Sequence, residues 1–471
     1  MVFSSTVFIF LFLPLVLAIY FLLQNKLRNL FLLLASLFFY AWGEGLLVLL
    51  MMGSIAVNYV VGIAISTNKD KHRPIVSKIL LGVGVGLNLL VLAYYKYIHF
   101  IVENLESIGL HFNIDISGVT LPIGISFFTF QSISYLVDVH RGTVKGQESI
   151  VNLGMYIALF PQLIAGPIVR YVDISKEIEK RKVTPALFKT GITRFLTGFA
   201  KKIIIANNVG LIADKVFGGA VDELSSPLAW IGILCYTLQI YYDFSGYSDM
   251  AIGLGKMFGF NFKENFDHPY ISRSVQEFWR RWHISLSTWF RDYLYIPLGG
   301  NRKGKIRTYV NLLIVFFLTG LWHGASWNFI VWGMFHGFFL IVERMDLFSL
   351  PERLNFLKRF YLLLVVMVGW VIFRAEDLGY AIGYIETMFA FTKGTYEYPY
   401  LFLNTYTLMV IILGVLFSAP LRAGAVKYLA MRLPNQNWAF AMEHVIYVSL
   451  FILSLLELAQ TTYNPFIYFR F

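Results

Sequence analysis

Charged residues are scarce in this sequence. They make up 14% of its 471 residues, whereas hydrophobic residues make up 57%. A soluble globular protein carries roughly 45–50% apolar and about 25% charged residues. The mean hydropathy of +0.64 also shows that the chain is more apolar than a soluble globular protein. The composition excludes a disordered chain and a cytosolic soluble enzyme, and it indicates a protein that lies in a membrane.

Cysteine is almost absent as well. Cys235 is the only one, which excludes an internal disulfide, a disulfide-rich secreted scaffold and a metal site built from a cysteine cluster. Its neighbours are apolar, so we interpret Cys235 as a small buried hydrophobic residue. The sequence also lacks a P-loop, a His-Glu-x-x-His zinc motif and a Gly-x-Ser-x-Gly nucleophile motif. We therefore expect no metal and none of these common soluble chemistries.

The charge that is present is mostly positive, with 39 Lys and Arg against 28 Asp and Glu and a net charge of +11. We expect no nucleic-acid partner, because the chain has no soluble basic domain to bind one. In a multi-pass membrane protein the basic excess collects in cytosolic loops. The loops at 69–73, 176–189, 301–307 and 422–432 are basic and are predicted to be cytosolic. The loop at 103–119 has no Lys or Arg, and the C-terminus is predicted to lie outside with it.

Apolar runs separated by short polar loops follow one another along the chain. One helical crossing needs about 20 mostly apolar residues, so the length allows roughly ten to thirteen crossings. The first run, 7–23, lacks the basic start of a signal peptide and is interpreted as a membrane helix. The sequence predicts an all-α polytopic membrane protein, with 1–471 forming one integral-membrane domain surrounded by lipid. The predicted spans cover residues 7–23, 30–50, 54–65, 79–97, 228–242, 310–321, 327–342, 357–373, 401–417 and 443–458.

Two acidic residues directly follow one of these apolar runs. Polar groups inside a membrane are costly and are therefore candidates for function. Asp243 and Asp249 have no Lys or Arg between them. Either the carboxylates line a polar cavity, or the helix breaks here and they cap the start of the next helix. The helix break is the preferred interpretation.

The segment 278–291 combines aromatic residues with arginines. At helical spacing Trp279, Trp282 and His283 share one face, which predicts an amphipathic helix at the membrane interface. Arg280 and Arg281 lie mostly on other faces. Their side chains either extend toward the interface or hold the phosphates of a cytosolic cofactor. The residues alone favour the first interpretation.

A histidine, His323, lies between two strongly apolar runs. It can act as a general base, or it can form a hydrogen bond between helices that pack closely at Gly324. His283 lies about 18 residues before the basic loop 301–307 and His323 about 16 after it. Helical arms of these lengths would bring both histidines to a similar depth. A third histidine, His336, is interpreted as a packing residue.

Several longer segments resemble the membrane-bound O-acyltransferase family, and more narrowly the membrane subunit of alginate and peptidoglycan O-acetyltransferases. The likeness covers essentially the whole chain from 1–5 onward. It is carried by 121–127 (LPIGISF), 160–168 (FPQLIAGPI), 242–300 and Trp322-His323-Gly324. It implies about eleven transmembrane helices with re-entrant segments around a tunnel across the bilayer. It also implies acetyl transfer from cytosolic acetyl-CoA to a polysaccharide outside, in the inner membrane of a bacterium.

The resemblance also implies roles for individual residues. His323 matches the catalytic histidine of the family, and His283 matches its second functional histidine. The end of the chain, 464–471, resembles the C-terminal aromatic motif of the small partner protein in teichoic-acid D-alanylation, where a tyrosine is thought to carry the acyl group. Tyr468 takes that position here, and an interfacial aromatic anchor is the alternative. An extended tail of about ten residues spans about 33 Å, which reaches the bilayer midplane from outside.

These assignments give an expected mechanism. His323 acts as general base for Tyr468, because a phenol with a pKa near 10 needs one at neutral pH. The extracytoplasmic tail, 459–471, then offers the acetyl group to a serine-hydrolase-like acetyltransferase outside the membrane. Direct transfer without Tyr468, and a transporter of lipid-linked sugar or acyl groups without acyl chemistry, are the alternatives. Residues expected from charge and position to bind acetyl-CoA are Arg280, Arg281, Arg302, Lys303 and Lys305.

Overall fold

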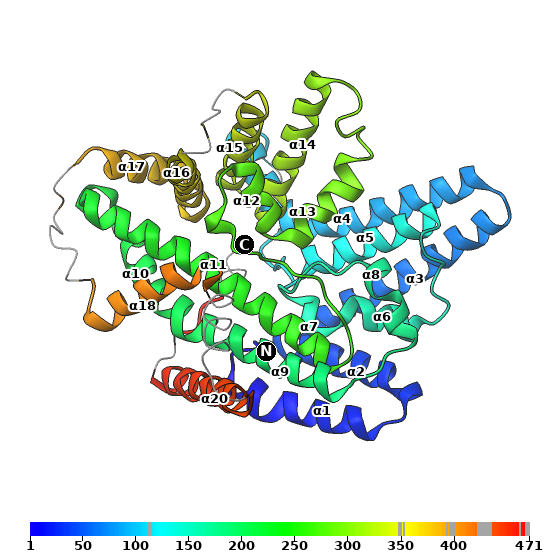
Figure 1. Cartoon of the computed structure of the whole chain (residues 1–471). Helices are drawn as coiled ribbons and strands as arrows, with labels where there is room; N and C mark the ends of the chain where they lie inside the picture. The colour runs from blue at the N-terminus through cyan, green and yellow to red at the C-terminus, as the bar shows by residue number, and fades with distance from the viewer. Residues whose placement is uncertain are drawn as a thin grey trace. The chain divides into compact units, whose positions relative to one another are not determined.

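The fold is entirely helical in the part of the chain that the structure describes. This computed structural model describes residues 1–111, 115–346, 351, 354–391, 394, 402–421, 436–460 and 463–466. Within these ranges every regular element is a helix (Figure 1). The predicted all-α class is therefore confirmed, whereas the expected number of about eleven crossings stays a prediction.

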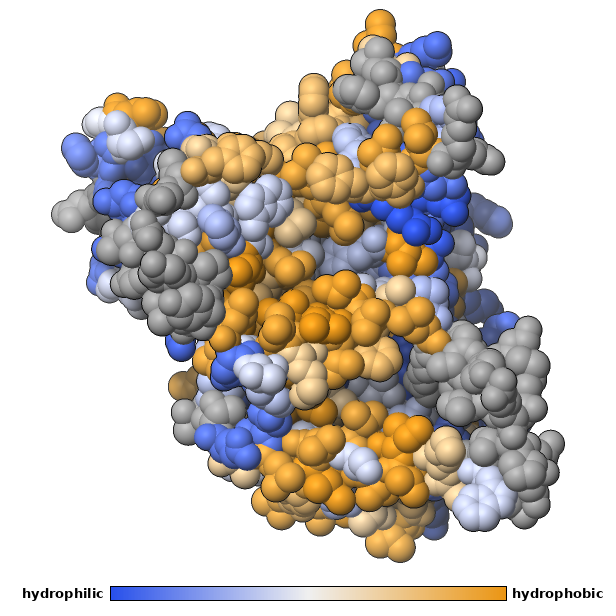
Figure 2. Space-filling view, turned by 60° about the vertical axis from the view of Figure 1, so that its left-hand side comes forward, coloured by the Kyte–Doolittle hydropathy of each residue, from blue (hydrophilic) through white to orange (hydrophobic). Residues whose placement is uncertain are grey.

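Six helical segments in the described ranges are long and apolar enough to cross a membrane, and two shorter apolar helices accompany them. Five of the six are less than half buried over their most apolar windows, with Leu46 and Leu90 among the exposed side chains, whereas Pro185–Phe217 is mostly buried. Figure 2 shows hydrophobic side chains over wide areas of one face. Apolar surface of this kind suits contact with lipid. The six segments are Asn25–Asp70, Pro74–Ser107, Pro185–Phe217, Lys305–His323, Asn355–Arg374 and Ala441–Gln460, and the shorter helices are Phe8–Leu22 and Thr405–Phe417.

The chain divides into two compact units, and α9 (Pro185–Ala200) and α11 (Ser226–Met257) contribute residues to both. The first unit contains Met1–Ile192 and Met250–Lys263. Within it α3 packs against α4 and α5, and α2 packs against α6. Its elements are η1 (Phe8–Phe12), α1 (Leu13–Leu22), α2 (Asn25–Glu44), η2 (Gly45–Leu47), α3 (Val48–Asp70), α4 (Pro74–Ser107), α5 (Ile125–Arg141), α6 (Ile150–Ala158), α7 (Phe160–Leu163) and α8 (Tyr171–Glu179).

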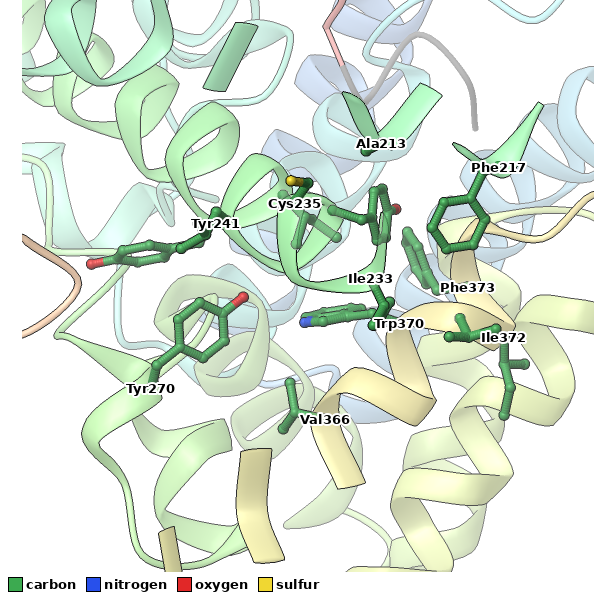
Figure 3. Packing of buried hydrophobic residues seen from close by; sticks show 14 of the residues in the cluster. Ala213, Phe217, Ile233, Cys235, Tyr241, Tyr270, Val366, Trp370, Ile372 and Phe373 are labelled. Carbon is green, nitrogen blue, oxygen red and sulfur yellow. The ribbon is translucent and has the colours of Figure 1, made fainter. Parts of the chain in front are cut away.

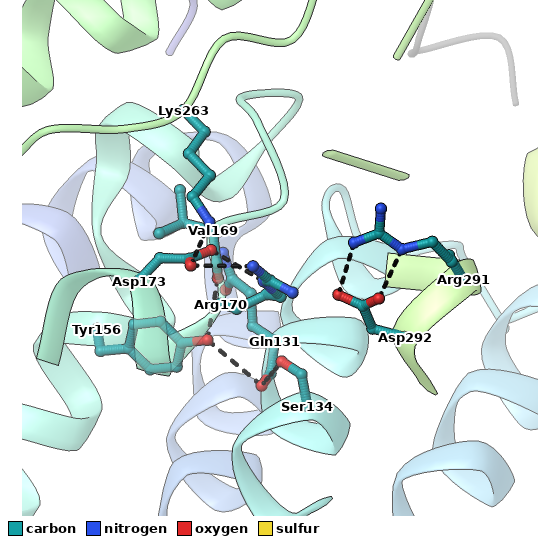
Figure 4. Close-up of polar contacts among 9 residues, drawn as sticks. All are labelled: Gln131, Ser134, Tyr156, Val169, Arg170, Asp173, Lys263, Arg291 and Asp292. Atoms are coloured by element: carbon teal, nitrogen blue, oxygen red, sulfur yellow. Dashed lines mark hydrogen bonds and ion pairs between the residues drawn. The ribbon is translucent and has the colours of Figure 1, made fainter. Parts of the chain in front are cut away.

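Polar contacts hold the start of α8 in this first unit (Figure 4). The Asp173 carboxylate accepts hydrogen bonds from Arg170, at 2.9 Å, and from Lys263, at 2.5 Å. Burial alone would raise the pKa of Asp173, but these two bonds hold it below its ordinary value. The Tyr156 hydroxyl donates to the Val169 carbonyl oxygen at 3.0 Å. The turn before α8 is thus fixed by paired charges and a buried hydroxyl.

The second unit contains Thr193–Asp249 and Glu264–Phe471, and it carries both candidate histidines. Here α14 packs against α15, and α15 packs against α16 and α12. Its elements are α9 (Pro185–Ala200), the π-helical turn η3 (Lys201–Ala206), α10 (Asn207–Phe217), η4 (Val221–Glu223), α11 (Ser226–Met257), η5 (Pro269–Ile271), α12 (Val275–Arg281), α13 (Ile284–Phe290), η6 (Arg291–Tyr295), α14 (Lys305–His323), α15 (Trp327–Arg344), α16 (Asn355–Arg374), α17 (Leu378–Phe389), α18 (Thr405–Phe417) and α20 (Gln436–Gln460).

A buried aromatic cluster forms the core of the second unit (Figure 3). Trp370 of α16 lies at its centre, with its ring 5.0 Å from Trp282 and 6.0 Å from Trp332. Tyr241 and Cys235 of α11 belong to the same cluster. Cys235 is buried, which confirms its interpretation as a core residue. Because close-packed rings resist displacement, this core gives the neighbouring histidines a fixed frame.

The α14–α15 hairpin brings two backbones into unusually close contact. A Cβ atom at Gly320 would collide with the carbonyl oxygen of Phe329, and one at Gly333 would collide with that of Phe316. Only glycine therefore fits at these two positions, as in other membrane helices that pack through small residues. His323 is the last residue of α14, so this contact fixes its position.

Candidate active site

His283 lies between α12 and α13 rather than inside a helix. Its backbone has φ +45°, the left-handed region, which costs about 1–3 kcal/mol in a residue other than glycine. The Ile284 amide donates to the Asn265 carbonyl oxygen at 2.9 Å and holds this bend. The prediction of one amphipathic helix over 278–291 is therefore wrong. The bend directs the His283 side chain inward, where it is fully buried.

Asn265 fixes the state of the His283 ring. Its side-chain oxygen accepts from the Ser285 amide, at 3.2 Å, and from the Ser285 hydroxyl, at 2.8 Å, and it lies 3.1 Å from His283 Nδ1. Its amide nitrogen donates to Ser248 at 3.0 Å. Because a side-chain carbonyl oxygen only accepts, Nδ1 carries the proton and Nε2 is the basic nitrogen.

His283 is held neutral. Burial lowers its pKa to about 3, because the charged ring would lose its hydration. Nε2 is buried and has no hydrogen-bond partner in the described part of the chain. This nitrogen is thus suited to accept a hydrogen bond from a hydroxyl or thiol, and unsuited to donate one to a developing anion.

His323 and His283 both contact the ring of Trp322, so the two histidines lie close to each other. The Trp322 ring centroid is 4.9 Å from that of His323 and 5.8 Å from that of His283. On its other sides His323 makes edge-on contacts with Trp332, at 5.0 Å, and Phe373, at 5.2 Å. The structure therefore brings together the two histidines that the spacing placed at similar depth.

His336 packs within the aromatic core. Its ring lies edge-on to Trp279 and Trp332, each with centroids 5.2 Å away. It is fully buried. The interpretation as a packing residue agrees with this environment.

The two acidic residues of α11 are both paired with lysines, and the helix runs unbroken past them. Asp243 forms an ion pair with Lys202 at 2.8 Å, and Asp249 with Lys201 at 2.7 Å. Arg194 also donates to Asp249, at 2.7 Å. The predicted helix break is therefore wrong. The prediction failed because the two carboxylates pair with basic residues of α9 and η3 and do not cap a new helix. These partners lie more than forty residues earlier in the chain.

The five basic residues expected to bind acetyl-CoA lie at two different places along the chain, on α12 and at or just before the start of α14. Arg280 is exposed at the end of α12, whereas Arg281 pairs with Glu277, at 3.0 Å, and with Asp267, at 2.9 Å. The other three lie at the start of α14, and His323 ends that helix, about 27 Å away at 1.5 Å per residue. Those three are Arg302, Lys303 and Lys305, all exposed.

The expected carrier, Tyr468, lies outside the described residues. The preceding tail residues, 463–466, are described and contact α10, α11 and η3. Phe466 is only 4% exposed, and its ring stacks on Tyr247 of α11 with centroids 4.6 Å apart. Sequence reasoning also missed Asn265 and Lys202, because neither stands in a recognisable motif with its partner.

Fold and site together define a multi-pass membrane protein with a buried histidine pair. Residues 146–378 match the model of the membrane-bound O-acyltransferase family. The chain is 44% identical to the probable alginate O-acetylase AlgI of Pseudomonas putida over the full length of both. It therefore belongs to the membrane-bound O-acyltransferase family and is an acyltransferase.

Two further relatives are named as acyltransferases of peptidoglycan and of teichoic acid. The peptidoglycan O-acetyltransferase of Helicobacter pylori is 36% identical over 82% of this chain and 80% of that protein. The teichoic acid D-alanyltransferase of Bacillus subtilis is 32% identical over 45% of this chain and 56% of that protein. Among the described residues no group of His, Cys, Asp and Glu is arranged to hold a metal ion.

Proposed function

We propose that this enzyme moves acetyl groups from cytosolic acetyl-CoA across the inner membrane of a bacterium, for O-acetylation of a polysaccharide outside. The observation that carries the proposal is the pair of buried histidines on Trp322, in a chain whose full-length relative is named as an alginate O-acetylase. The route divides the transfer into one step on each side of the membrane. Only the small neutral acetyl group then crosses the bilayer, and the charged CoA stays in the cytosol.

His323 is the general base in this proposal. The Tyr468 oxygen attacks the thioester carbonyl carbon while its proton passes to His323. The carbon–sulfur bond then breaks, and the CoA thiolate leaves with the proton that His323 returns. The product is an acetyl ester of Tyr468. A hydroxyl of the polysaccharide later receives the acetyl group through an extracytoplasmic serine-hydrolase-like partner.

His283 has a different part in the same step. Its Nδ1 proton is committed toward Asn265, so its Nε2 accepts a hydrogen bond from the attacking hydroxyl or from the CoA sulfur as a thiol. Because the His283 ring stays neutral, Nε2 orients the reacting group through a hydrogen bond and does not take up its proton. Arg280 and Arg281, at most three residues away in sequence, supply positive charge for the CoA phosphates.

The tail supports the route through Tyr468. Phe466 stacks on Tyr247, while Phe244, one turn earlier on α11, contacts His283 with ring centroids 4.7 Å apart. Residues three apart on a helix are about 5–6 Å from each other. Tyr468 follows Phe466 by two residues, and an extended chain covers about 7 Å over that distance. The chain is therefore long enough for Tyr468 to approach the histidine pair.

The test is to incubate detergent-purified protein with acetyl-labelled acetyl-CoA and to map the label. We expect label on the C-terminal peptide of the wild type, and none in His323→Ala or Tyr468→Phe. Thioester turnover without label on that peptide would replace the tyrosine route by direct transfer. No turnover, with or without an extracytoplasmic partner, would overturn the acetyl-CoA proposal and favour transport without acyl chemistry.

A further inference from the structure

A buried ion pair receives the C-terminal segment at one end. The side chains of Lys202 and Asp243 are 4% and 2% exposed and form an ion pair at 2.8 Å. Lys202 Nζ also donates to the carbonyl oxygen of Pro465. An ammonium group has three protons to satisfy, and a buried one is costly when any of them lacks an acceptor. The tail carbonyl thus supplies this lysine with an acceptor in addition to Asp243.

A second charged group receives the other end of the described tail. The Tyr463 hydroxyl donates to Asp214 Oδ2 at 2.6 Å, and the other oxygen of Asp214 pairs with Arg374 at 2.9 Å. Hydrogen bonds to a charged group are about twice as strong as neutral ones. The tail is thus held at Tyr463 and at Pro465 by two independent ion pairs.

Contacts between these two points complete the arrangement. Asn207 lies 3.4 Å from the Tyr463 carbonyl oxygen and from the Asn464 side-chain oxygen. Beyond Pro465, Phe466 is buried against Tyr247. An aromatic anchor at a membrane surface needs only apolar contact and one wet edge. Four consecutive residues that meet two ion pairs, one buried and one partly buried, point to a specific docking site instead.

We propose that these residues form a clamp, defined as Lys202, Asp243, Asn207, Asp214 and Arg374, which docks 463–466 and so holds the acyl-accepting tail beside the histidine pair. This rests on the proposed function, because it gives the docked tail a purpose in acyl transfer. The tail is already part of the chain, and docking restricts it to the neighbourhood of the site, which raises the effective concentration of the acceptor. The clamp residues are positioning residues, since none of them has to touch the acetyl group.

The first experiment measures docking alone, without chemistry. Tyr463→Phe removes one hydroxyl and keeps the ring. We expect carboxypeptidase to trim the tail of this variant about tenfold faster than that of the wild type, the effect of losing one hydrogen bond to a charged group. Tyr384→Phe is the matched control, because its buried hydroxyl donates to the Ala229 carbonyl oxygen at 2.7 Å. Equal trimming rates in all three proteins would overturn the clamp whatever the chemistry is.

The second experiment separates positioning from structural damage by opposite changes in KM. A full-length Tyr468→Phe chain keeps a docked tail that cannot accept acetyl, and a synthetic peptide of residues 459–471 serves as acceptor. Tyr463→Phe in the chain's own tail should lower the KM for this peptide about tenfold, because the competing tail leaves more easily. Tyr463→Phe in the peptide should raise its KM by a similar factor, and kcat should not change in either case.

The outcomes for the clamp and for the acetyl-tyrosine step are distinguishable. If neither the wild-type tail nor the peptide takes label while thioester turnover continues, the acetyl-tyrosine step fails and the purpose assigned to the clamp fails with it. If the wild-type tail and the peptide are both labelled but the KM values do not change on Tyr463→Phe, only the clamp is overturned. Loss of folded protein does not explain a KM that falls for one placement of the substitution and rises for the other.

Discussion

At the scale of single residues, the site depends on how His283 is held. A left-handed bend, full burial and an acceptor at Nδ1 leave it neutral with Nε2 as its basic nitrogen. His323 was conspicuous because a histidine between apolar runs is costly, whereas His283 was singled out by its aromatic segment and by the family resemblance. The role of Asn265 was not predictable, because it comes from a loop 18 positions earlier in the chain and carries no motif.

Changing Asn265 to aspartate tests the assigned ring state. The carboxylate raises the pKa of His283, since an opposite charge within about 4–6 Å favours the charged ring. One opposite charge shifts a pKa by about 1–3 units, and the pKa of His283 starts at about 3. Activity should therefore stay near the wild-type value at neutral pH and fall as the pH drops below about 6, where Nε2 becomes protonated. A pH–rate profile of acetyl-CoA turnover measures this. Ser248→Ala, which removes only the partner of the Asn265 amide nitrogen, should keep the wild-type profile.

Acid stability gives a second prediction for His283. In the unfolded chain histidine binds a proton near pH 6.5, but in the folded protein only near pH 3. Unfolding therefore takes up a proton between these values, and the free energy of unfolding should fall by up to about 1.4 kcal/mol per pH unit as the pH drops below 6.5. His283→Asn, which tolerates the left-handed bend, should flatten this slope in thermal unfolding between pH 7.5 and pH 5.5. An unchanged slope would contradict the buried neutral state.

At the scale of helices, the α14–α15 hairpin positions His323 through contacts that only glycine allows. Helix class and the rough position of both helices followed from apolar periodicity. The unbroken course of α11 could not be predicted from the sequence, because its carboxylates are neutralised by Lys201 and Lys202. The division between α12 and α13 was hidden for a similar reason. Helical periodicity continues through Trp282 and His283, whereas the bend is held by hydrogen bonds from a distant loop.

A methyl group at Gly333 tests the hairpin. Gly333→Ala places a Cβ against the Phe316 carbonyl oxygen, so the helices must separate, at a cost of about 1–3 kcal/mol. We expect a lower melting temperature in detergent and slower turnover, because His323 moves with α14. The control is Gly82→Ala in α4, where a Cβ meets nothing within 4 Å and helix propensity favours alanine by about 1 kcal/mol. Equal melting temperatures for the two variants would contradict the close contact.

At the scale of the whole molecule, composition alone identified a multi-pass membrane protein, because 57% hydrophobic residues leave no soluble alternative. Composition did not locate the CoA site. Charge pointed to two groups of basic residues, and the structure shows that the group at the start of α14 is about 27 Å from His323 along that helix. That length is close to the hydrocarbon thickness of about 30 Å. If 301–307 faces the cytosol as its charge predicts, His323 lies most of a bilayer away from it.

Charge reversal at each group determines which one holds the donor. Arg280 is exposed, makes no ion pair within the described residues, and is three residues from His283. Arg280→Glu should raise the KM for acetyl-CoA about tenfold with a smaller effect on kcat, because it turns an attraction for phosphate into a repulsion. Lys303→Glu is the matched control at the start of α14, and its KM should stay within about twofold of the wild type, the effect of one distant exposed charge. The reverse result would place the CoA phosphates at 301–307, and the acyl arm would then have to extend along α14 to reach His323.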